Sequence, residues 1–143
     1  MKELIEHLRP LVTEDRWNRF NMILTERTQY ITIVLENIYQ PLNASAVLRS
    51  AECFGIQDVH VIENYNEFSP DREVAMGSSK WLNIKRYNEE KNNTLQCIKE
   101  LKKEGYRIVA TTPHKNNCNL NDFQLTKGKT ALLFGTELEG LTN

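Results

Sequence analysis

The stretch Tyr30–Glu63, YITIVLENIYQPLNASAVLRSAECFGIQDVHVIE, predicts the unit on which the fold is built. Its first part, YITIVLENI, is apolar and rich in β-branched residues, as is typical of a strand buried on both faces. Its middle part has apolar residues at helical spacing, and DVHVIE at its end is a second strand. A strand, a helix and a strand in this order favour an α/β fold with a mostly parallel sheet flanked by helices.

The helix within this stretch is expected to run from Ala44 to Phe54, with Asn43 as its N-cap and Gly55 at its C-terminal end. The stripe expected to face the core comprises Ala44, Val47, Leu48, Ala51 and Phe54. At about 100° per residue, Arg49 lies nearly opposite the middle of that stripe. Arg49 therefore faces either solvent or a ligand at the carboxyl edge of the sheet, where ligands of open α/β sheets bind.

The remainder of the chain continues the alternation of strands and helices. Further strands are predicted over 81–87, 106–112 and 129–134, with Trp81 in the core, and helices over 69–79 and 88–105. Ser69 is expected to cap the shorter helix. The longer helix is expected to turn Leu95, Ile98 and Leu101 toward the sheet.

Residues 1–28 are predicted to form a helical extension before an α/β domain over 29–143. A first helix stops at Pro10, and Thr13 begins a second helix with an apolar stripe of Trp17, Phe20 and Leu24. On a regular helix Arg16, Arg19 and Arg27 fall within about 80° of one another. Such a group is either a solvated charged face or a surface that binds phosphate.

Composition narrows the class of protein. The 143 residues carry a formal net charge of −1, so a surface that binds nucleic acid would have to be local. Cys53, Cys97 and Cys118 form no CxxC pair, and the three histidines are scattered, so we expect a reducing compartment and no metal site. No signal peptide or membrane span is expected at the N-terminus, and the predicted location is cytoplasmic.

Several segments carry a family resemblance. NASAVLRSAECFG (43–55) resembles the first signature of the SpoU (TrmH-type) RNA 2′-O-ribose methyltransferases, in which an arginine follows an asparagine by six residues. LLFGTELEGLTN (132–143) resembles the start of the second signature, with Gly-x-Glu-x-x-Gly-Leu after an apolar strand. GSSKW (77–81), GYRIVATTPH (105–114) and DRWNRFNMILTERTQYITIVLENI (15–38) are also similar to that family, the last to its tRNA branch.

The resemblance implies a SPOUT-type fold with a trefoil knot, a homodimer, and methylation of tRNA by S-adenosylmethionine, at the D-loop guanosine 18. The family's third signature, whose chain threads the knot, is absent from this sequence, so the domain is expected to be incomplete at its C-terminal end. Ribosomal RNA is the alternative substrate. Two other classes stay open: a non-catalytic RNA-binding fragment, and an unrelated α/β nucleotide-binding enzyme.

The resemblance also implies roles for particular residues. Arg49 is catalytic, Asn43 positions the substrate or Arg49, and Glu137 pairs with Arg49 or fixes the cofactor loop. A free guanidinium has a pKa above about 12, so Arg49 either deprotonates the ribose hydroxyl with help from an RNA phosphate or binds that phosphate and orients the hydroxyl. The implied cofactor residues are Thr111, Thr112, Gly135, Glu137 and Gly140. The implied RNA-binding residues are Arg16, Arg19, Arg27 and Lys80.

Overall fold

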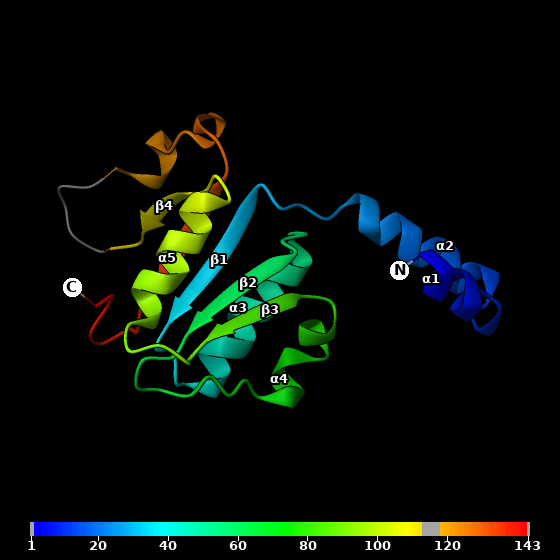
Figure 1. Cartoon of the computed structure of the whole chain (residues 1–143), viewed down its shortest axis with the longest axis horizontal. Coiled ribbons are helices and arrows are strands. Elements are labelled where there is room, and N and C mark those ends of the chain that lie inside the picture. Colours follow the sequence, from blue (N-terminus) through cyan, green and yellow to red (C-terminus); the bar gives the residue numbers. More distant parts are fainter. Residues whose placement is uncertain (1, 113–117, 143) are drawn as a thin grey trace.

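The computed structural model describes residues 2–112 and 118–142. Five parallel strands form one sheet in the order β3-β2-β1-β5-β4 (Figure 1). The strands are β1 (Ile31–Glu36), β2 (Asp58–Ile62), β3 (Asn83–Tyr87), β4 (Arg107–Ala110) and β5 (Thr130–Phe134). The predicted parallel α/β sheet is confirmed, whereas the family's knot stays a prediction.

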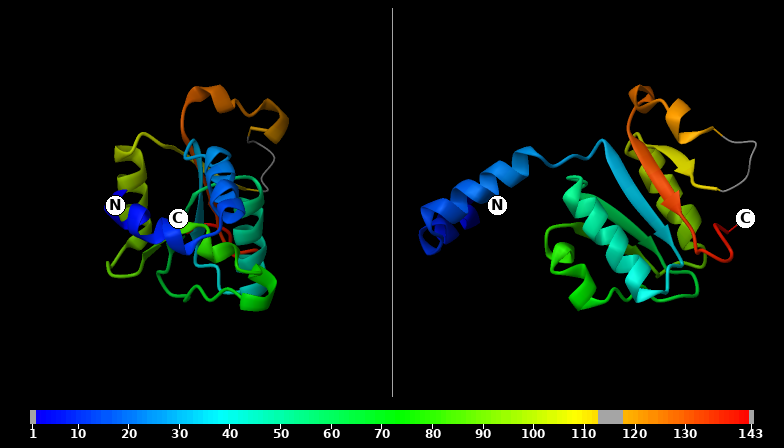
Figure 2. Two further views of the ribbon diagram at one scale, coloured as in Figure 1. Left: turned by 90° about the vertical axis from the view of Figure 1, so that its right-hand side faces the viewer. Right: turned by 180° about the vertical axis from the view of Figure 1, so that it is seen from behind.

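Helices cover both faces of this sheet. One face carries α3 (Pro41–Cys53) and the short α4 (Arg72–Ala75), and the other carries α5 (Asn93–Lys103) (Figures 1 and 2). Single 3₁₀ turns are η1 (Arg9–Leu11), η2 (Ser78–Lys80), η3 (Leu120–Asp122) and η4 (Leu125–Lys127). None of the described helices is both long and apolar enough to cross a membrane.

Alternate residues of β1 supply two separate cores, because successive side chains of a strand point to opposite faces. Ile33 and Leu35 pack in the cluster that contains Leu48 of α3. Val34 packs in the second cluster, which contains Leu101 of α5. The central strand is therefore buried on both sides, as its continuous apolar run predicts.

The N-terminus of α3 differs from the prediction. The helix begins at Pro41 with Gln40 as N-cap residue, so the assignment of Asn43 as N-cap was wrong. A proline has the backbone angle of a first helical residue and lacks an N–H that would be unpaired there, which favours the earlier start. Asn43 therefore lies inside the first turn.

The C-terminus of α3 is a Schellman motif, and the predicted place of Gly55 is confirmed. Gly55 has φ +71°, its N–H donates to Glu52 O (3.2 Å), and Ile56 N–H donates to Ala51 O (2.9 Å). Phe54 is the capping residue and is 81% exposed, so its predicted core position was wrong. Its backbone has left the helical repeat on which the predicted stripe was based.

Three other side chains differ from the prediction. Leu95 is 48% exposed, and the buried residues of α5 include Cys97 and Leu101 instead. Trp81 is 44% exposed and makes an edge-to-face contact with Phe20, at 5.8 Å between ring centroids. Asp71, rather than Ser69, caps α4 by accepting hydrogen bonds from the backbone of Glu73 and Val74.

The N-terminal extension projects from the α/β layers (Figures 1 and 2). It consists of α1 (Lys2–Leu8), η1 and α2 (Glu14–Thr25), and no residue of these elements is buried. Arg27 lies beyond the end of α2, so it does not share a helical face with Arg16 and Arg19 as predicted. Its guanidinium is 3.1 Å from the carboxylate of Glu52 and joins the extension to the end of α3.

Gly55 holds the joint between the extension and α3, because a Cβ there would lie 2.3 Å from Glu26 O. We expect Gly55→Ala to lower the free energy of unfolding by about 3 kcal/mol, since strain at positive φ and a backbone clash add together. Gly105→Ala is the control, because Gly105 has φ +86° but a Cβ there would have no neighbouring atom within 4 Å. That control should cost about 1 kcal/mol. Equal losses in urea unfolding would contradict the role of the Glu26 contact.

Candidate functional site

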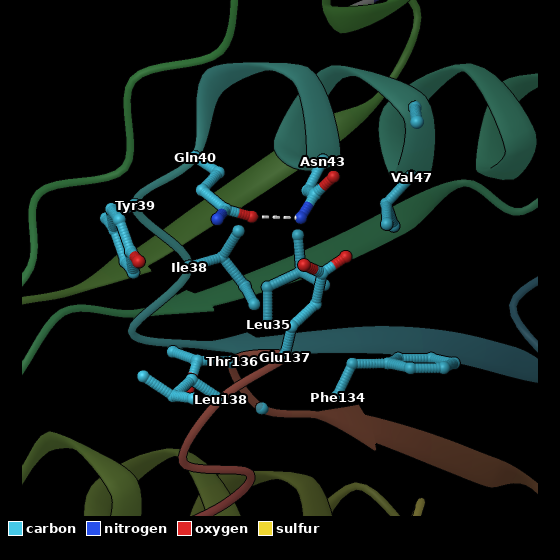
Figure 3. A pocket seen from close by; sticks show the side chains of 12 residues that line it. Leu35, Ile38, Tyr39, Gln40, Asn43, Val47, Phe134, Thr136, Glu137 and Leu138 are labelled. Carbon is cyan, nitrogen blue, oxygen red and sulfur yellow. Dashed lines mark hydrogen bonds between the residues drawn. The ribbon is translucent and has the colours of Figure 1, made fainter.

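A pocket of about 560 Å³ opens where the carboxyl ends of β1 and β5 meet the first turns of α3 (Figure 3). Three segments line it: the end of β1 with the loop after it, the start of α3, and the loop after β5. Its lining residues are Leu35, Ile38, Tyr39, Gln40, Asn43, Ala46, Val47 and Phe134–Leu138. This size and position are typical of small-molecule sites in parallel α/β sheets.

Asn43 and Glu137 occupy opposite walls of this pocket. Figure 3 shows the carboxylate of Glu137 pointing across the space toward Asn43. The Asn43 carboxamide donates a hydrogen bond to Gln40 Oε1, so the N-cap residue of α3 orients it. The structure therefore brings together two predicted site residues that are far apart in the sequence.

Arg49 does not line the pocket. It lies further along α3 and is exposed, in agreement with its predicted position opposite the core-facing stripe. Among residues 2–112 and 118–142, no hydrogen-bond acceptor or carboxylate pairs with its guanidinium. Its side chain is thus available to an external anion.

The loop after β5 is closed by its own backbone. Thr136 and Gly140 exchange two N–H···O hydrogen bonds of 3.0 Å, and Glu139 N–H donates to Thr136 Oγ1 (3.0 Å). A Cβ on Gly135 would lie 2.0 Å from Gly140 O, so this turn requires glycine at position 135. The closed turn places Glu137 at its tip, beside the pocket.

Thr111 and Thr112 follow β4, which pairs with β5 on the side away from β1. The N–H and hydroxyl of Thr111 both donate to Leu133 O, at 3.0 and 2.8 Å. Neither threonine lines the pocket that contains Gly135 and Glu137. Residues 113 and 114 of the matching motif, and Asn143, lie outside the described residues. The cofactor roles of the threonines and of Gly140 stay predictions.

The predicted RNA-binding residues fall into two environments. Arg16 and Arg19 are exposed on α2, and the Phe20–Trp81 contact places that helix beside the turn that ends at Lys80. The side chain of Arg27, by contrast, is only 8% exposed and is paired with Glu52. Arg16, Arg19 and Lys80 are therefore accessible to a polyanion, whereas Arg27 already has a partner within the protein.

Sequence reasoning missed two buried carboxylates at the carboxyl ends of β1 and β2. Glu36, at the end of β1, accepts hydrogen bonds from Thr94 and Thr142. Glu63, just after β2, accepts from Arg86 at 2.5 and 2.8 Å, and these hydrogen bonds lower the pKa of Glu63. The sequence does contain a signal for both residues, since each is an acid directly after an apolar run. In a parallel sheet the ends of such runs lie close together.

Among the described residues no group of three histidine, cysteine or carboxylate side chains is placed to hold a metal ion. The polar groups around the pocket are instead amides, hydroxyls and the carboxylate of Glu137. Such a lining suits an organic ligand with an apolar body and a few polar groups.

Comparison with known proteins gives consistent matches. Residues 30–143 match the model of the SpoU rRNA Methylase family. The chain is 41% identical over 135 residues to the tRNA (guanosine(18)-2'-O)-methyltransferase of Borreliella burgdorferi, covering 94% of this chain and 60% of that protein. The chain therefore spans less than two thirds of the length of this relative.

Solved structures agree with the sequence comparison. The A. aeolicus TrmH/SpoU tRNA modifying enzyme superposes with a TM-score of 0.76 and 25% identity, over 90% of this chain and 64% of that one. The SpoU methyltransferase AviRb from Streptomyces viridochromogenes, solved in complex with the cofactor AdoMet, has a TM-score of 0.63 and 23% identity, over 82% and 44%. The similarity to AviRb shows a shared fold.

The closed turn after β5 yields a prediction. Gly135→Ala should open the Thr136–Gly140 hydrogen bonds, because its Cβ would overlap Gly140 O. We expect amide hydrogen exchange over 136–140 to become at least about tenfold faster, as loss of two hydrogen bonds implies. Gly140→Ala is the comparison: a Cβ at Gly140 would have no atom within 4 Å, and only its φ of +73° adds strain, so exchange there should accelerate less than in Gly135→Ala. Slow exchange in Gly135→Ala would show that the clash is relieved elsewhere.

Proposed function

This chain belongs to the SpoU rRNA methylase family, and we propose that it forms part of an enzyme that methylates a ribose 2′-hydroxyl of tRNA with S-adenosylmethionine. The observation that carries the proposal is the pocket walled by Asn43 and Glu137, one from each family signature. The pocket lies where parallel α/β sheets bind their ligands. The proposed target is the D-loop guanosine at position 18, and the B. burgdorferi relative is named as a tRNA (guanosine(18)-2'-O)-methyltransferase.

One observation favours tRNA over ribosomal RNA as the substrate, and a second favours binding of RNA in general. The similarity to the B. burgdorferi enzyme covers 94% of this chain and thus includes most of the helical extension. That extension presents Arg16 and Arg19 to solvent, and its Phe20 contacts Trp81, the residue after Lys80. Phosphate contacts by such cations hold RNA without reading its bases, and a ribose hydroxyl distinguishes RNA from DNA.

The pocket fits the nucleoside part of S-adenosylmethionine in size and in chemical character. Leu35, Ile38, Val47 and Phe134 would contact the flat base, and the side chains of Asn43 and Glu137 supply polar groups on the two walls. The bound cofactor supplies an electrophilic methyl group. The carboxylate of Glu137 favours a cationic ligand, whose charge it would partly balance.

Arg49 is proposed to act on the substrate side. Methylation requires the 2′-hydroxyl to lose its proton as it attacks. A guanidinium is a poor base, but it binds a phosphate through two parallel hydrogen bonds and can orient an adjacent hydroxyl. The exposed, unpaired state of Arg49 among the described residues supports this role over direct deprotonation.

A homodimer in the cytoplasm is part of this proposal. The extension exposes large apolar side chains that a second subunit would cover, namely Leu4, Ile5, Leu8, Leu11 and Leu24. Two-fold dimers are also the commonest oligomers. Sedimentation of the purified chain measures the oligomeric state directly.

Two measurements test the proposed function. Isothermal calorimetry with S-adenosylmethionine should detect binding to the 143-residue chain. Methyl transfer to unmodified tRNA, followed by mapping of the methylated ribose, should locate the D-loop guanosine. No detectable binding of S-adenosylmethionine would support the RNA-binding alternative for this chain, and methyl transfer to ribosomal RNA alone would contradict the tRNA assignment.

Arg49→Lys separates the two roles considered for Arg49. We expect transfer to fall by about 100-fold, because lysine keeps the charge but loses the planar pair of donors that positions a phosphate. Binding of S-adenosylmethionine should be unchanged, since Arg49 lies outside the pocket. Lys102→Arg, an exposed substitution in the last turn of α5, is the control. Turnover like that of the wild type would exclude the phosphate-clamp role.

Arg16→Gln with Arg19→Gln tests the extension as an RNA-binding surface. The slope of log K against log salt for tRNA binding should become shallower by about 1.5, as two lost phosphate contacts imply. The matched control is Lys102→Gln with Lys103→Gln, which removes the same charge from the exposed end of α5. An equal change in both double variants would indicate only a general effect of net charge.

A further inference from the structure

Glu36 is an unusual residue for the end of a central strand. It is 1% exposed, and no cation of the described residues pairs with it. Its carboxylate instead accepts hydrogen bonds from the Thr94 hydroxyl (2.5 Å), the Thr142 hydroxyl (2.7 Å) and the Thr142 N–H (2.8 Å). A buried carboxylate is tolerated only with such partners.

These partners come from two other parts of the fold. Thr94 lies in the first turn of α5, and Thr142 follows the closed turn after β5. Glu36 therefore joins the end of β1 to α5 and to the segment that carries Glu137. Both of its oxygens are used, and each faces a donor.

Among residues 2–112 and 118–142, few other hydrogen bonds attach the segment 135–142 to the rest of the fold. The Thr136–Gly140 bonds are internal to the turn and do not fix its direction. Leu141 packs against the cluster on the α5 side, and Tyr65 Oη lies 3.4 Å from Glu139. The two Thr142 bonds are shorter than the Tyr65 contact and end on a fully buried group, so they are the firmer polar attachment.

Asn37, the next residue, holds the loop that carries Tyr65. It adopts a left-handed backbone conformation with φ +55°, and its Oδ1 accepts a hydrogen bond from Asn64 N–H (2.9 Å). Its backbone oxygen accepts from the Asn66 side chain (3.0 Å). The end of β1 thus organises both segments that contact the closed turn.

We propose that Glu36 is a positioning residue, whose carboxylate holds the 135–142 segment so that Glu137 stays opposite Asn43. Four residues after Glu36, Gln40 is the N-cap residue of α3 and orients Asn43. One short segment of chain therefore sets both walls of the pocket. That this arrangement serves cofactor binding rests on the proposed function, whereas the positioning itself does not.

The chemistry of the partners specifies which variants are informative. Glu36→Gln can keep the network, because its amide oxygen can accept from Thr142 N–H while its NH₂ donates to the two hydroxyls. Glu36→Ala removes every bond at once and leaves the donors facing a cavity. Thr142→Val removes one bond from an exposed residue and preserves shape, so it leaves the core intact.

Amide hydrogen exchange on the 143-residue chain tests the positioning. We expect exchange over 136–142 to be roughly fivefold faster in Thr142→Val, as loss of one hydrogen bond implies, and faster still in Glu36→Ala. Glu36→Gln should stay close to the wild type. Thr126→Val, at an exposed threonine of η4, is the matched control and should change nothing in this segment.

Calorimetry on the same variants, with S-adenosylmethionine as the probe, tests the consequence for binding. Affinity should fall several-fold in Thr142→Val and Glu36→Ala and be restored in Glu36→Gln. A wild-type chain that does not bind the probe would refute the proposed function, while the exchange result would still decide the positioning.

Unchanged exchange over 136–142 in Thr142→Val overturns the proposal, even if Glu36→Ala fails to fold. Equal acceleration in Glu36→Gln and Glu36→Ala, with Thr142→Val unaffected, also overturns it, because the charge rather than the hydrogen bonds would then matter.

Discussion

The structure depends on the pairing of β1 with a parallel strand on each side. β2 and β5 both align with β1 so that their carboxyl ends lie at one edge of the sheet. Two of the segments that leave this edge, the start of α3 and the closed turn after β5, form the pocket between them. Because β1 is buried on both faces by two separate clusters, it is a rigid base for those segments.

Buried carboxylates at that edge attach the loops to the sheet, because loop residues make no regular helix or strand hydrogen bonds there. Glu36 and Glu63 each end an apolar run, and each accepts hydrogen bonds from a loop that would otherwise lack partners. Their burial is costly unless every oxygen is used, and in both residues it is. The hydrogen bonds of Glu36 also join the end of β1 to the segment that carries the pocket residue Glu137.

The strands were predictable because buried parallel strands have apolar, β-branched sequences that few other structures favour. Helix ends and exposure were harder to predict. The helix α3 begins earlier in the chain than predicted because Pro41 favours the first helical position. Phe54 is exposed because the chain turns out of the helix at Gly55. Leu95 was expected to face the sheet from helical spacing, and Trp81 was placed in the core, yet both side chains are exposed. Local pattern does not specify what lies opposite a side chain.

The sequence by itself determined the parallel α/β class, the family signatures and the candidates Asn43, Arg49 and Glu137, since each depends on residues close together in the chain. Only the tertiary structure decided that Asn43 and Glu137 face one pocket while Arg49 lies outside it, and that Arg27 is paired with Glu52. It also decided that Glu36 holds the segment carrying Glu137. These relations join residues distant in sequence, and they follow from strand order and packing, which local patterns do not encode.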